Sequence, residues 1–491
     1  MVFPIVGGTQ STGYEISNSL RLNDGDSPHL ARTNASGGNR NTFTTSFWIK
    51  RGVLTGSGMK IFDVGTSTST DTGRFFLGFF GADTFAVVGG ATTFRTTNQV
   101  FRDTSAWYHF VVAVDTTDST ADDRIKVYVN GNQVTSFGTS NNPSSSLNTP
   151  VNENSKSHQI GRNQPGTSEH FDGYITEFHH VDGSALAQTE FGEFDDNGVW
   201  IPKQYTGSHG TNGVYLQFKQ TGTSANSSGI GADTSGNDNH FTPTNLAATD
   251  ITEDTCTNNF ATLVPTLNMT LSEGNVKAMT SRTGNWDGVH ASIGLTSGKW
   301  YFETKVSNAS GTFRVKSGIV GNPETFTILY NGQGTSADPL DVLSNTYPSY
   351  GKGVWLSHWY DQNYNTSSTA SAQSSGDILQ FALDMDNYKM WIGVNGQFKD
   401  NSNNNVSYSD VASGSSATVT IASAAYTGKT FFPDVWLRDD DGSFDNVAEI
   451  NFGNPSFSIS SGNTDGKYGN FEYAVPSGFY AICTKRLAEF G

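Results

Sequence analysis

The sequence predicts an all-β protein: two antiparallel β-sandwich (jelly-roll) domains in tandem, joined by a connector rich in Gly, Ser and Asn. Two runs of alternating apolar residues, 124–134 and 388–398, each lead into Asn-Gly, the dipeptide favoured in two-residue type I′ hairpin turns. Gly is abundant (54 residues), only 15% of residues are charged, and 12% are aromatic. Turn-forming residues combined with aromatic core material are typical of a β protein with long surface loops.

The first domain is predicted as a series of short strands separated by Gly, Asn and Asp. The hairpin strand places Ile125, Val127 and Val129 on one face, because side chains alternate along a strand. This spacing indicates an antiparallel sandwich. The predicted strands are 14–23, 43–52, 60–66, 73–81, 84–90, 92–97, 106–115, 124–134, 158–163 and 171–183.

Several blocks in this region occur in a recognisable order: FTTSFWIKRG, WYHFVVAVD, IKVYVNGNQV, IGRN and FDGYITEFHHVDG. In this order they resemble laminin-G-like, concanavalin-A-like jelly rolls over about residues 14–200. The resemblance implies a fold and not a single function, because this jelly roll serves lectins, adhesion modules and glycanases.

A connector is predicted between the two domains. Residues 184–203 are expected to contain a helical turn, and 213–220 one further strand. Residues 221–245 are rich in Gly, Ser and Asn with almost no core residues, which is typical of a linker or an extended surface arm. The predicted boundaries are 1–205 for the first sandwich, 206–265 for the connector and 266–491 for the second sandwich.

The second domain contains another set of strand-like runs, and the second hairpin places Met390, Ile392 and Val394 on one face. The blocks GKWYFE, GDILQFALD, the hairpin with Trp391, FFPDVWL and INFG resemble the SPRY (B30.2-like) sandwich over about residues 280–455. Long Asn/Ser/Tyr-rich insertions replace the loops that bind peptides in that family, so peptide recognition is not implied. The predicted strands are 268–279, 297–308, 313–321, 376–398, 429–438, 447–453 and 478–487.

Charge and hydropathy exclude several classes of partner. The formal net charge is −17, and no run of Lys and Arg exceeds two residues, which argues against nucleic acid and anionic membranes. No apolar stretch approaches the roughly 20 residues of a membrane-spanning helix. The N-terminus lacks the basic and apolar regions of a signal peptide.

The two cysteines, Cys256 and Cys483, flank the second domain, where its two ends could meet. A disulfide between them and two unpaired thiols are both compatible with the sequence.

Catalytic motifs are weak. The acidic run Glu193-Phe194-Asp195-Asp196 lacks the second Glu of the carboxylate pattern used by retaining glycosidases, and we interpret it as a solvated acidic turn. His179 and His180 are adjacent on a strand and should point to opposite faces. With His158 they suggest a metal site, but no matching Cys/His spacing accompanies them. No enzymatic activity and no required cofactor are therefore expected.

Three consecutive acids, Asp439, Asp440 and Asp441, follow a predicted strand. Loop carboxylates are the hard oxygen ligands that Ca²⁺ prefers, although the EF-hand spacing is absent. A calcium site at the sandwich rim and a solvated acidic loop remain the two interpretations.

The most ligand-like feature is an aromatic tract. Exposed Trp and Tyr rings stack on sugars, and neighbouring Asn and Asp bind hydroxyl groups. The alternative is that Trp355 and Trp359 fix a long loop to the domain. The candidate carbohydrate-binding residues are Trp355, His358, Trp359, Tyr360 and Tyr364.

The whole layout resembles virion proteins of tailed bacteriophages from marine environments. The connector blocks DTSGNDNHF and TNNFATLVP are the most specific part, because neither sandwich family requires them. The resemblance implies a tail fibre or spike subunit that contacts host cell-surface glycan and other virion proteins, as a homo-oligomer, most plausibly a trimer. A head fibre or capsid decoration protein is the alternative on the virion. A polysaccharide depolymerase and a secreted host lectin are alternatives from other classes.

Overall fold

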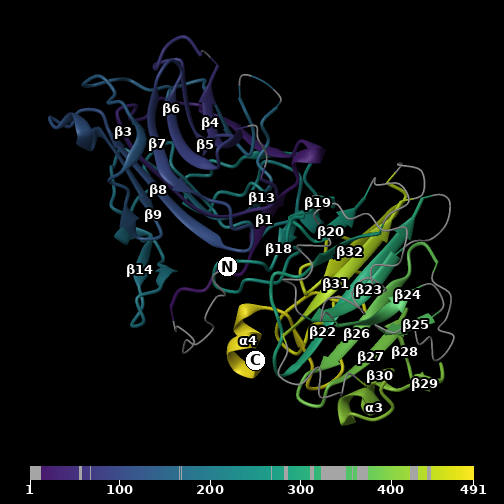
Figure 1. Ribbon diagram of the computed structural model, residues 1–491. Helices are drawn as coiled ribbons and strands as arrows, with labels where there is room; N and C mark the ends of the chain where they lie inside the picture. Colours follow the sequence, from purple (N-terminus) through teal and green to yellow (C-terminus); the bar gives the residue numbers. More distant parts are fainter. Residues whose placement is uncertain are drawn as a thin grey trace. The chain divides into compact units, whose positions relative to one another are not determined.

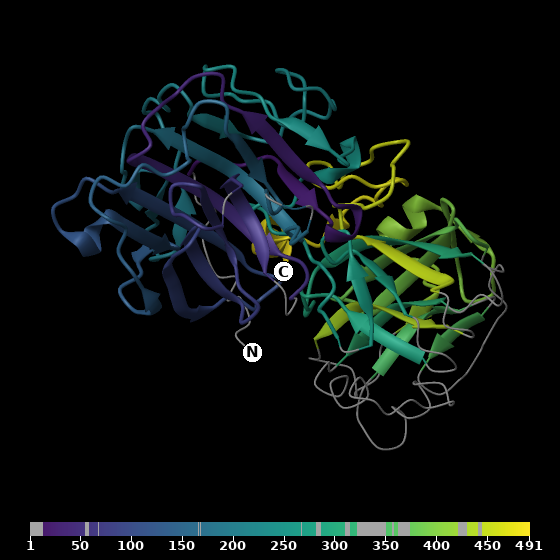
Figure 2. The same ribbon diagram turned by 90° about the horizontal axis from the view of Figure 1, so that it is seen from above.

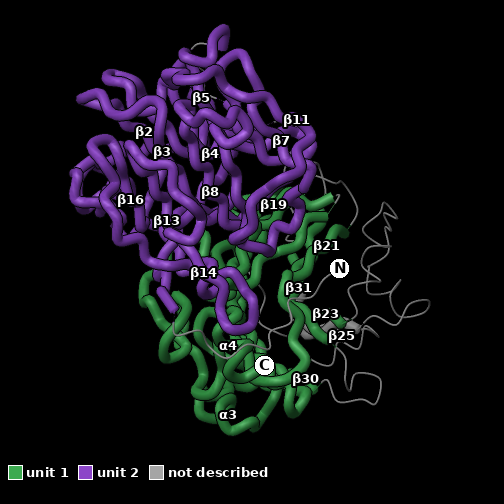
Figure 3. Tube along the Cα trace, turned by 90° about the vertical axis from the view of Figure 1, so that its left-hand side faces the viewer, with its two compact units in different colours: residues 1–10, 259–491 green, residues 11–258 purple. Residues whose placement is uncertain are grey.

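The computed structural model divides the chain into two compact units (Figures 1 and 3). We call them the N-terminal unit, residues 11–258, and the C-terminal unit, residues 259–491. The structure describes residues 13–491 apart from 55–57, 67, 165, 167, 267, 281–285, 310–314, 322–349, 356–357, 362–373, 421–429 and 440–443.

The N-terminal unit is a sandwich of two antiparallel sheets of eight strands each, seen in Figures 1 and 2 as two stacked layers. One sheet has the order β10 (Asn132–Gln133), β9 (Ile125–Val129), β8 (Trp107–Asp115), β3 (Thr42–Arg51), β13 (Gly173–Asp182), β1 (Ser19–Leu22) and β18 (Ile251–Thr252), with β16 (Val214–Leu216) paired to β13. The other has the order β11 (Phe137–Ser140), β7 (Thr93–Val100), β6 (Thr84–Gly89), β5 (Arg74–Phe79), β4 (Met59–Gly65), β12 (Ser157–Ile160), β2 (His29–Thr33) and β17 (Thr242–Thr244).

The core between these sheets is aromatic. Phe47 from β3 stacks on Phe110 at 5.9 Å and on Phe178 at 6.0 Å between ring centroids. Phe85, from the opposite sheet, stacks on Phe110 at 4.3 Å. All four rings are buried, so the alternating Phe residues of the sequence supply the contacts between the sheets.

The C-terminal unit is a second antiparallel sandwich. Its larger sheet has the order β19 (Thr270–Ser272), β20 (Lys277–Met279), β32 (Asn446–Asn451), β22 (Lys299–Asn308), β26 (Ile378–Asp384), β27 (Lys389–Val394), β28 (Gln397–Lys399) and β29 (Asn405–Val406). β30 (Val419–Thr420) pairs with β27, and β33 (Tyr480–Ala481) pairs with β22. The smaller sheet has the order β21 (Trp286–His290), β31 (Phe431–Arg438), β23 (Val315–Gly321), β24 (Tyr350–Trp355) and β25 (His358–Asp361). The short helices α3 (Tyr408–Ser413) and α4 (Thr484–Phe490) complete the unit.

Both predicted Asn-Gly hairpins are confirmed. Asn130 and Gly131 have φ of 44° and 80°, and Asn395 and Gly396 have φ of 49° and 87°, as a type I′ turn requires. The Asn side chain has the same role in each turn, because its Oδ1 accepts a backbone N–H from the neighbouring strand. The donor is His109 at 2.7 Å in the first hairpin and Ile378 at 2.9 Å in the second.

The stretch predicted as a connector is structured differently from the prediction. Residues 206–258 belong to the N-terminal unit and supply β16, β17 and β18 to its two sheets. The units divide between Asn258 and Asn259. Gly- and Asn-rich sequence here forms hydrogen-bonded turns instead of a linker: both Asp233 carboxylate oxygens accept backbone N–H groups, from Tyr215 at 2.8 Å and Asn239 at 2.9 Å.

The predicted helical turn in 184–203 is present as a short 3₁₀ turn, η3 (Gln188–Glu190), and a two-stranded hairpin follows it, β14 (Gly192–Phe194) and β15 (Trp200–Pro202). Two other local predictions differ from the structure. The predicted strand 268–279 is the hairpin of β19 and β20. The predicted strand 478–487 is divided between the short strand β33 (Tyr480–Ala481), which pairs with β22, and the first turn of α4.

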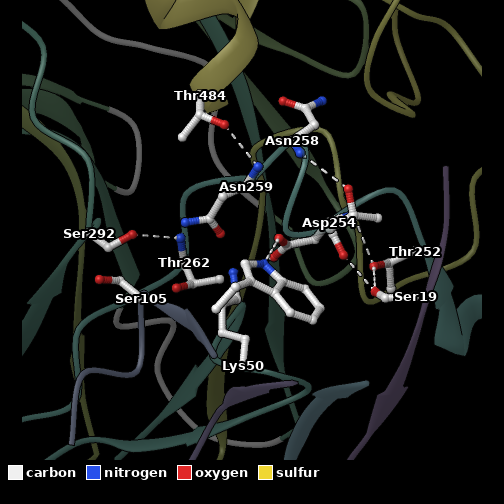
Figure 4. Close-up of polar contacts among 12 residues, drawn as sticks. Ser19, Lys50, Ser105, Thr252, Asp254, Asn258, Asn259, Thr262, Ser292 and Thr484 are labelled. Atoms are coloured by element: carbon white, nitrogen blue, oxygen red, sulfur yellow. Dashed lines mark hydrogen bonds and ion pairs between the residues drawn. The ribbon is translucent and has the colours of Figure 1, made fainter. Parts of the chain in front are cut away.

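A buried ion pair joins the end of the segment that was predicted as a connector to β3 of the first sheet. Lys50 Nζ lies 2.5 Å from Asp254 Oδ2, and both side chains are 1% exposed or less. Trp107 Nε1–H donates to Asp254 Oδ1 at 3.3 Å, and Ser19 Oγ donates to the Asp254 carbonyl at 2.6 Å (Figure 4). Burial lowers the pKa of Lys50, and the neighbouring Asp254 opposes this shift.

Removing one partner of this pair should be costly, because the other charge stays buried without compensation. We expect Asp254→Ala to lower the free energy of unfolding by about 3–5 kcal/mol. Denaturant unfolding followed by tryptophan fluorescence measures the change.

The matched control is Glu153→Ala, which removes a half-exposed pair with Arg40 (29% and 30% side-chain exposure) and should cost no more than about 1 kcal/mol. Equal effects of the two substitutions would contradict the structural role of Asp254.

Candidate functional site

The outer face of the five-stranded sheet gathers aromatic and charged positions from all five strands. The opposite face lines the core with residues such as Val289 and Val435. Residues that lie opposite one another in antiparallel strands share a face. One cross-strand row on the outer face is Gly288, Trp436, Lys316, Trp355 and His358. The next outer row is His290, Asp434, Gly318, Gly353 and Tyr360.

Trp436 is held against the sheet by a glycine and by a carboxylate. A side-chain carbon at Gly288 would lie 2.5 Å from the Trp436 ring, so the ring lies where only glycine leaves room. Trp436 Nε1–H donates to Asp434 Oδ2 at 2.8 Å. Beside it, Lys316 Nζ lies 4.2 Å from the ring centroid of Trp286, within cation–π range. The two indoles and the ammonium group therefore form one cluster.

Asp434 is the chemically unusual group of this cluster. It is 2% exposed, and burial raises its pKa to about 7, although the Trp436 hydrogen bond and the charge of Lys316 act in the opposite direction. Its Oδ1 has no hydrogen-bond partner among the described residues. A carboxyl group with this pKa exists in both protonation states near neutrality, so Oδ1 can donate or accept a hydrogen bond.

The predicted aromatic tract adjoins this cluster only in part. β24 and β25 form a hairpin at the edge of the sheet, with Trp355 opposite His358 and Gly353 opposite Tyr360, and these positions lie in the outer rows. Trp359 lies opposite Val354, in the row that contains the core residues Val289 and Val435. Tyr364 lies outside the described residues.

Sequence reasoning missed Trp286, Lys316, Asp434 and Trp436. The strand 431–438 carried a usable signal, because Phe432, Asp434 and Trp436 occur at every second position and so share a face. Their proximity to β24 depends on strand pairing over long sequence separations, which the pattern does not specify.

The other predicted site residues do not form a site in the described structure. Asp439 is buried and accepts the Phe444 N–H at 2.7 Å, whereas Asp440 and Asp441 lie outside the described residues. In the described part of the chain, no group of three or more His, Cys, Asp and Glu side chains could hold a metal ion. Cys256 and Cys483 are not joined by a disulfide, and burial raises the pKa of Cys256.

The histidines of β13 point to opposite faces, as predicted. His180 packs inward between Phe43 and Phe62. His179 packs outward against Tyr215, with ring centroids 4.1 Å apart. Outside the sheet, His179 lines a narrow hollow with Ser46, Trp48, His109, Glu177, Phe191 and Pro202. The hollow has no room for a water molecule, so it is not a ligand pocket.

This hollow contains a Ser–His pair that resembles a catalytic dyad. Ser46 Oγ lies 2.9 Å from His109 Nε2, but His109 Nδ1 accepts the indole N–H of Trp200 at 2.9 Å. Burial lowers the pKa of His109 to about 3, so the ring is neutral and its proton lies on Nε2. Nε2–H therefore donates to Ser46 and cannot accept its proton, as a general base must.

A polar cluster on the outer face of the other N-terminal sheet is internally satisfied. Arg74 binds Asp63 through two hydrogen bonds, of 3.1 and 2.5 Å, and Lys60 Nζ lies 3.0 Å from Glu169 Oε1. Both cations also lie 4.5 Å from the ring centroid of Phe76. Phe76 is 6% exposed, so little of its ring is available for stacking.

Comparisons with known proteins agree with the fold. The family described as the concanavalin A-like lectin/glucanases superfamily matches residues 24–190, about a third of the chain. This match, together with the antiparallel sheets, confirms the all-β prediction and the laminin-G-like, concanavalin-A-like resemblance of the N-terminal region. No curated protein matches the sequence.

Solved structures with local similarity include a heptameric SAP-like pentraxin from Limulus polyphemus (17% identity, 36% of this chain, 80% of that chain, TM-score 0.27). The SPRY domain of human HERC1 has 14% identity and a TM-score of 0.23, and the match covers 35% of this chain and 86% of that one. A carbohydrate-binding protein from Bacteroides ovatus, described as putative, has 17% identity and a TM-score of 0.32 (47% of this chain, 58% of that chain). Among the described helices, none has the length and apolar character to cross a bilayer.

The raised pKa of Asp434 gives the stability of the protein a defined pH dependence. Because the folded-state pKa of about 7 exceeds the ordinary value of 3.8 for an aspartate, the folded state binds this proton more tightly than the unfolded state does. The contribution of Asp434 to stability is therefore present below about pH 4 and is lost as the pH rises to about 7. Asp434→Asn should flatten this part of the curve and raise stability at pH 8, by up to a few kcal/mol.

Unfolding free energies measured between pH 2 and pH 8 test this expectation. Asp465→Asn is the control of opposite sign. Burial alone would raise the pKa of Asp465, but Arg486 and backbone N–H groups together lower it, so its contribution to stability is present above about pH 4 and is lost only at lower pH. An unchanged pH profile in Asp434→Asn would show that Asp434 is an ordinary carboxylate.

Proposed function

We propose that this protein is a non-enzymatic structural protein of a tailed-bacteriophage virion, a tail fibre or spike subunit that binds carbohydrate on the host cell surface. The binding face in this proposal is the outer face of the five-stranded sheet of the C-terminal unit. The observation that carries it is the row of Trp436, Lys316, Trp355 and His358 across that sheet, next to the buried Asp434.

The chemistry of this face suits a sugar. Indole rings stack on the apolar faces of pyranose rings, and a few fixed polar groups select the orientation of hydroxyl groups. Because Trp436 is only 3% exposed, Trp355 is the residue that stacks on the sugar in this proposal. Lys316 supplies a donor and Asp434 supplies an oxygen without a partner among the described groups. Glycines at 318 and 353 in the neighbouring outer row leave that part of the sheet without side chains, so a ligand can approach the backbone.

The N-terminal unit supports carbohydrate as the class of ligand, but the described part of its surface offers no suitable binding site. Its match to a family described by lectins and glucanases is compatible with carbohydrate binding. However, the hollow on one outer face is small, and the charges on the other outer face pair with one another. We therefore assign glycan contact to the C-terminal unit.

The assignment to a virion rests on the sequence. The blocks YEISNSLRLND (14–24), DTSGNDNHF and TNNFATLVP and the segment GFYAICTKRL (478–487) resemble the layout of phage structural proteins. A homo-oligomer, favoured as a trimer, would present several copies of a weak glycan site and so raise the overall affinity through avidity. Labelling of intact particles separates a tail position from the alternative, capsid decoration.

Substitutions in adjacent rows test the binding face. We expect Trp355→Ala, in the outer row, to weaken binding to the best ligand on a bacterial glycan array by roughly tenfold, or about 1.4 kcal/mol, with little change in melting temperature. Trp359→Ala, in the neighbouring row of the register, should weaken binding less.

Arg162→Ala, on a half-buried residue of the N-terminal unit, is the control for the other sandwich. If Arg162→Ala lost binding while Trp355→Ala kept it, the binding site would lie on the N-terminal unit. Absence of binding to every bacterial glycan would refute the proposed carbohydrate ligand.

A further inference from the structure

The β14–β15 hairpin stands apart from both sheets of the N-terminal unit. It forms a separate two-stranded sheet and projects from the sandwich in Figure 1. The sequence segment that we interpreted as an acidic turn, 193–196, lies at its end. Nothing in the proposed glycan site uses this hairpin.

The base of the hairpin is fixed by Trp200. This indole is 8% exposed and donates to His109. Side-chain carbons at Gly131 and Gly192 would lie 2.2 and 2.4 Å from its ring atoms, so both backbones pack directly on the indole. Gln188 Nε2 also donates to the Gly131 carbonyl at 3.0 Å. The hairpin is therefore anchored on the first Asn-Gly turn.

The tip of the hairpin is ordered by its own hydrogen bonds. Asp195 Oδ1 accepts the N–H groups of Asn197 at 2.9 Å and Val199 at 2.8 Å. Gly198 has φ of 77°, which glycine adopts without strain. An ordered tip loses little conformational entropy when it is bound.

This ordered tip exposes apolar side chains. Phe194 is 50% exposed and Val199 is 56% exposed. Phe194 is fixed by an edge contact with Trp200, with ring centroids 4.9 Å apart. Phe194 lies opposite Trp200 on one face of the hairpin, and Val199 lies on the other face, so the two form an apolar pair on the two sides of the tip. Glu193 and Asp196 are exposed in the same segment. A pre-organised tip with an exposed aromatic side chain has the composition of a protein-binding hot spot when a pocket receives both faces.

We infer that the β14–β15 tip docks into a protein partner whose surface offers an apolar pocket bordered by Lys and Arg. The exposed apolar pair favours a protein over a glycan, and the carboxylates disfavour nucleic acid and anionic membrane. A second copy is the less suitable occupant, because the chain carries a net charge of −17. This inference is independent of the proposed glycan site and adds an attachment surface on the other unit.

A library of random peptides displayed on a carrier is the probe. Peptides are selected on the full-length protein and counter-selected on the F194S/V199S variant. The expected consensus combines Lys or Arg with apolar residues, and its synthetic peptide should bind F194S/V199S at least roughly tenfold more weakly than the wild type. E193Q/D196N should weaken binding several-fold and reduce its dependence on salt.

Val100→Ser is the matched control, because Val100 is also exposed (43%) and lies on a different strand of the same unit. It should leave peptide binding unchanged, and melting temperatures establish that every variant folds. The inference is overturned if the selected peptides lack Lys and Arg. It is also overturned if no selected peptide binds F194S/V199S more weakly than the wild type. Concentration-dependent dimerisation that disappears in F194S/V199S overturns it in favour of a second copy.

Discussion

The alternation of side chains along a strand determines where chemistry can occur in this protein. In β31 the odd positions, such as Val435 and Leu437, enter the core, and the even positions, Phe432, Asp434 and Trp436, lie on the other face. Pairing with β23 and β24 extends that face to Lys316 and Trp355. The same packing that forms the core therefore presents aromatic and charged positions in rows on the outside.

Two buried carboxylates differ in how completely the protein compensates their charge. Asp254 is fully buried but has an ammonium, an indole N–H and the surrounding chain to compensate it. Asp434 is equally buried, yet Trp436 binds only one of its oxygens, and its pKa is raised to about 7. A group whose ionisation is disfavoured and whose second oxygen lacks a described partner is a candidate for ligand contact, whereas a fully compensated pair is a structural element.

Local patterns predicted much of the fold from the sequence. The period of two and the Asn-Gly turns located both hairpins, since Asn130 and Asn395 act within a few residues of their strands. Residues 206–258 were misassigned because their β16, β17 and β18 contributions are only two or three residues long and pair with distant strands. The residues of the outer row could not be predicted for a related reason. The register that aligns Lys316 with Trp436 depends on pairing between strands that are far apart in the sequence. Trp359 was grouped with Trp355 by sequence proximity, while the register separates them.

Hydrogen–deuterium exchange of the full-length protein, with and without the best bacterial oligosaccharide, locates the sugar-binding face. If sugar binds to the five-stranded sheet, exchange should slow in β21, β31 and the β24–β25 hairpin. Protection confined to β4, β5 and β12 of the N-terminal unit, with none in the five-stranded sheet, would contradict binding at that sheet.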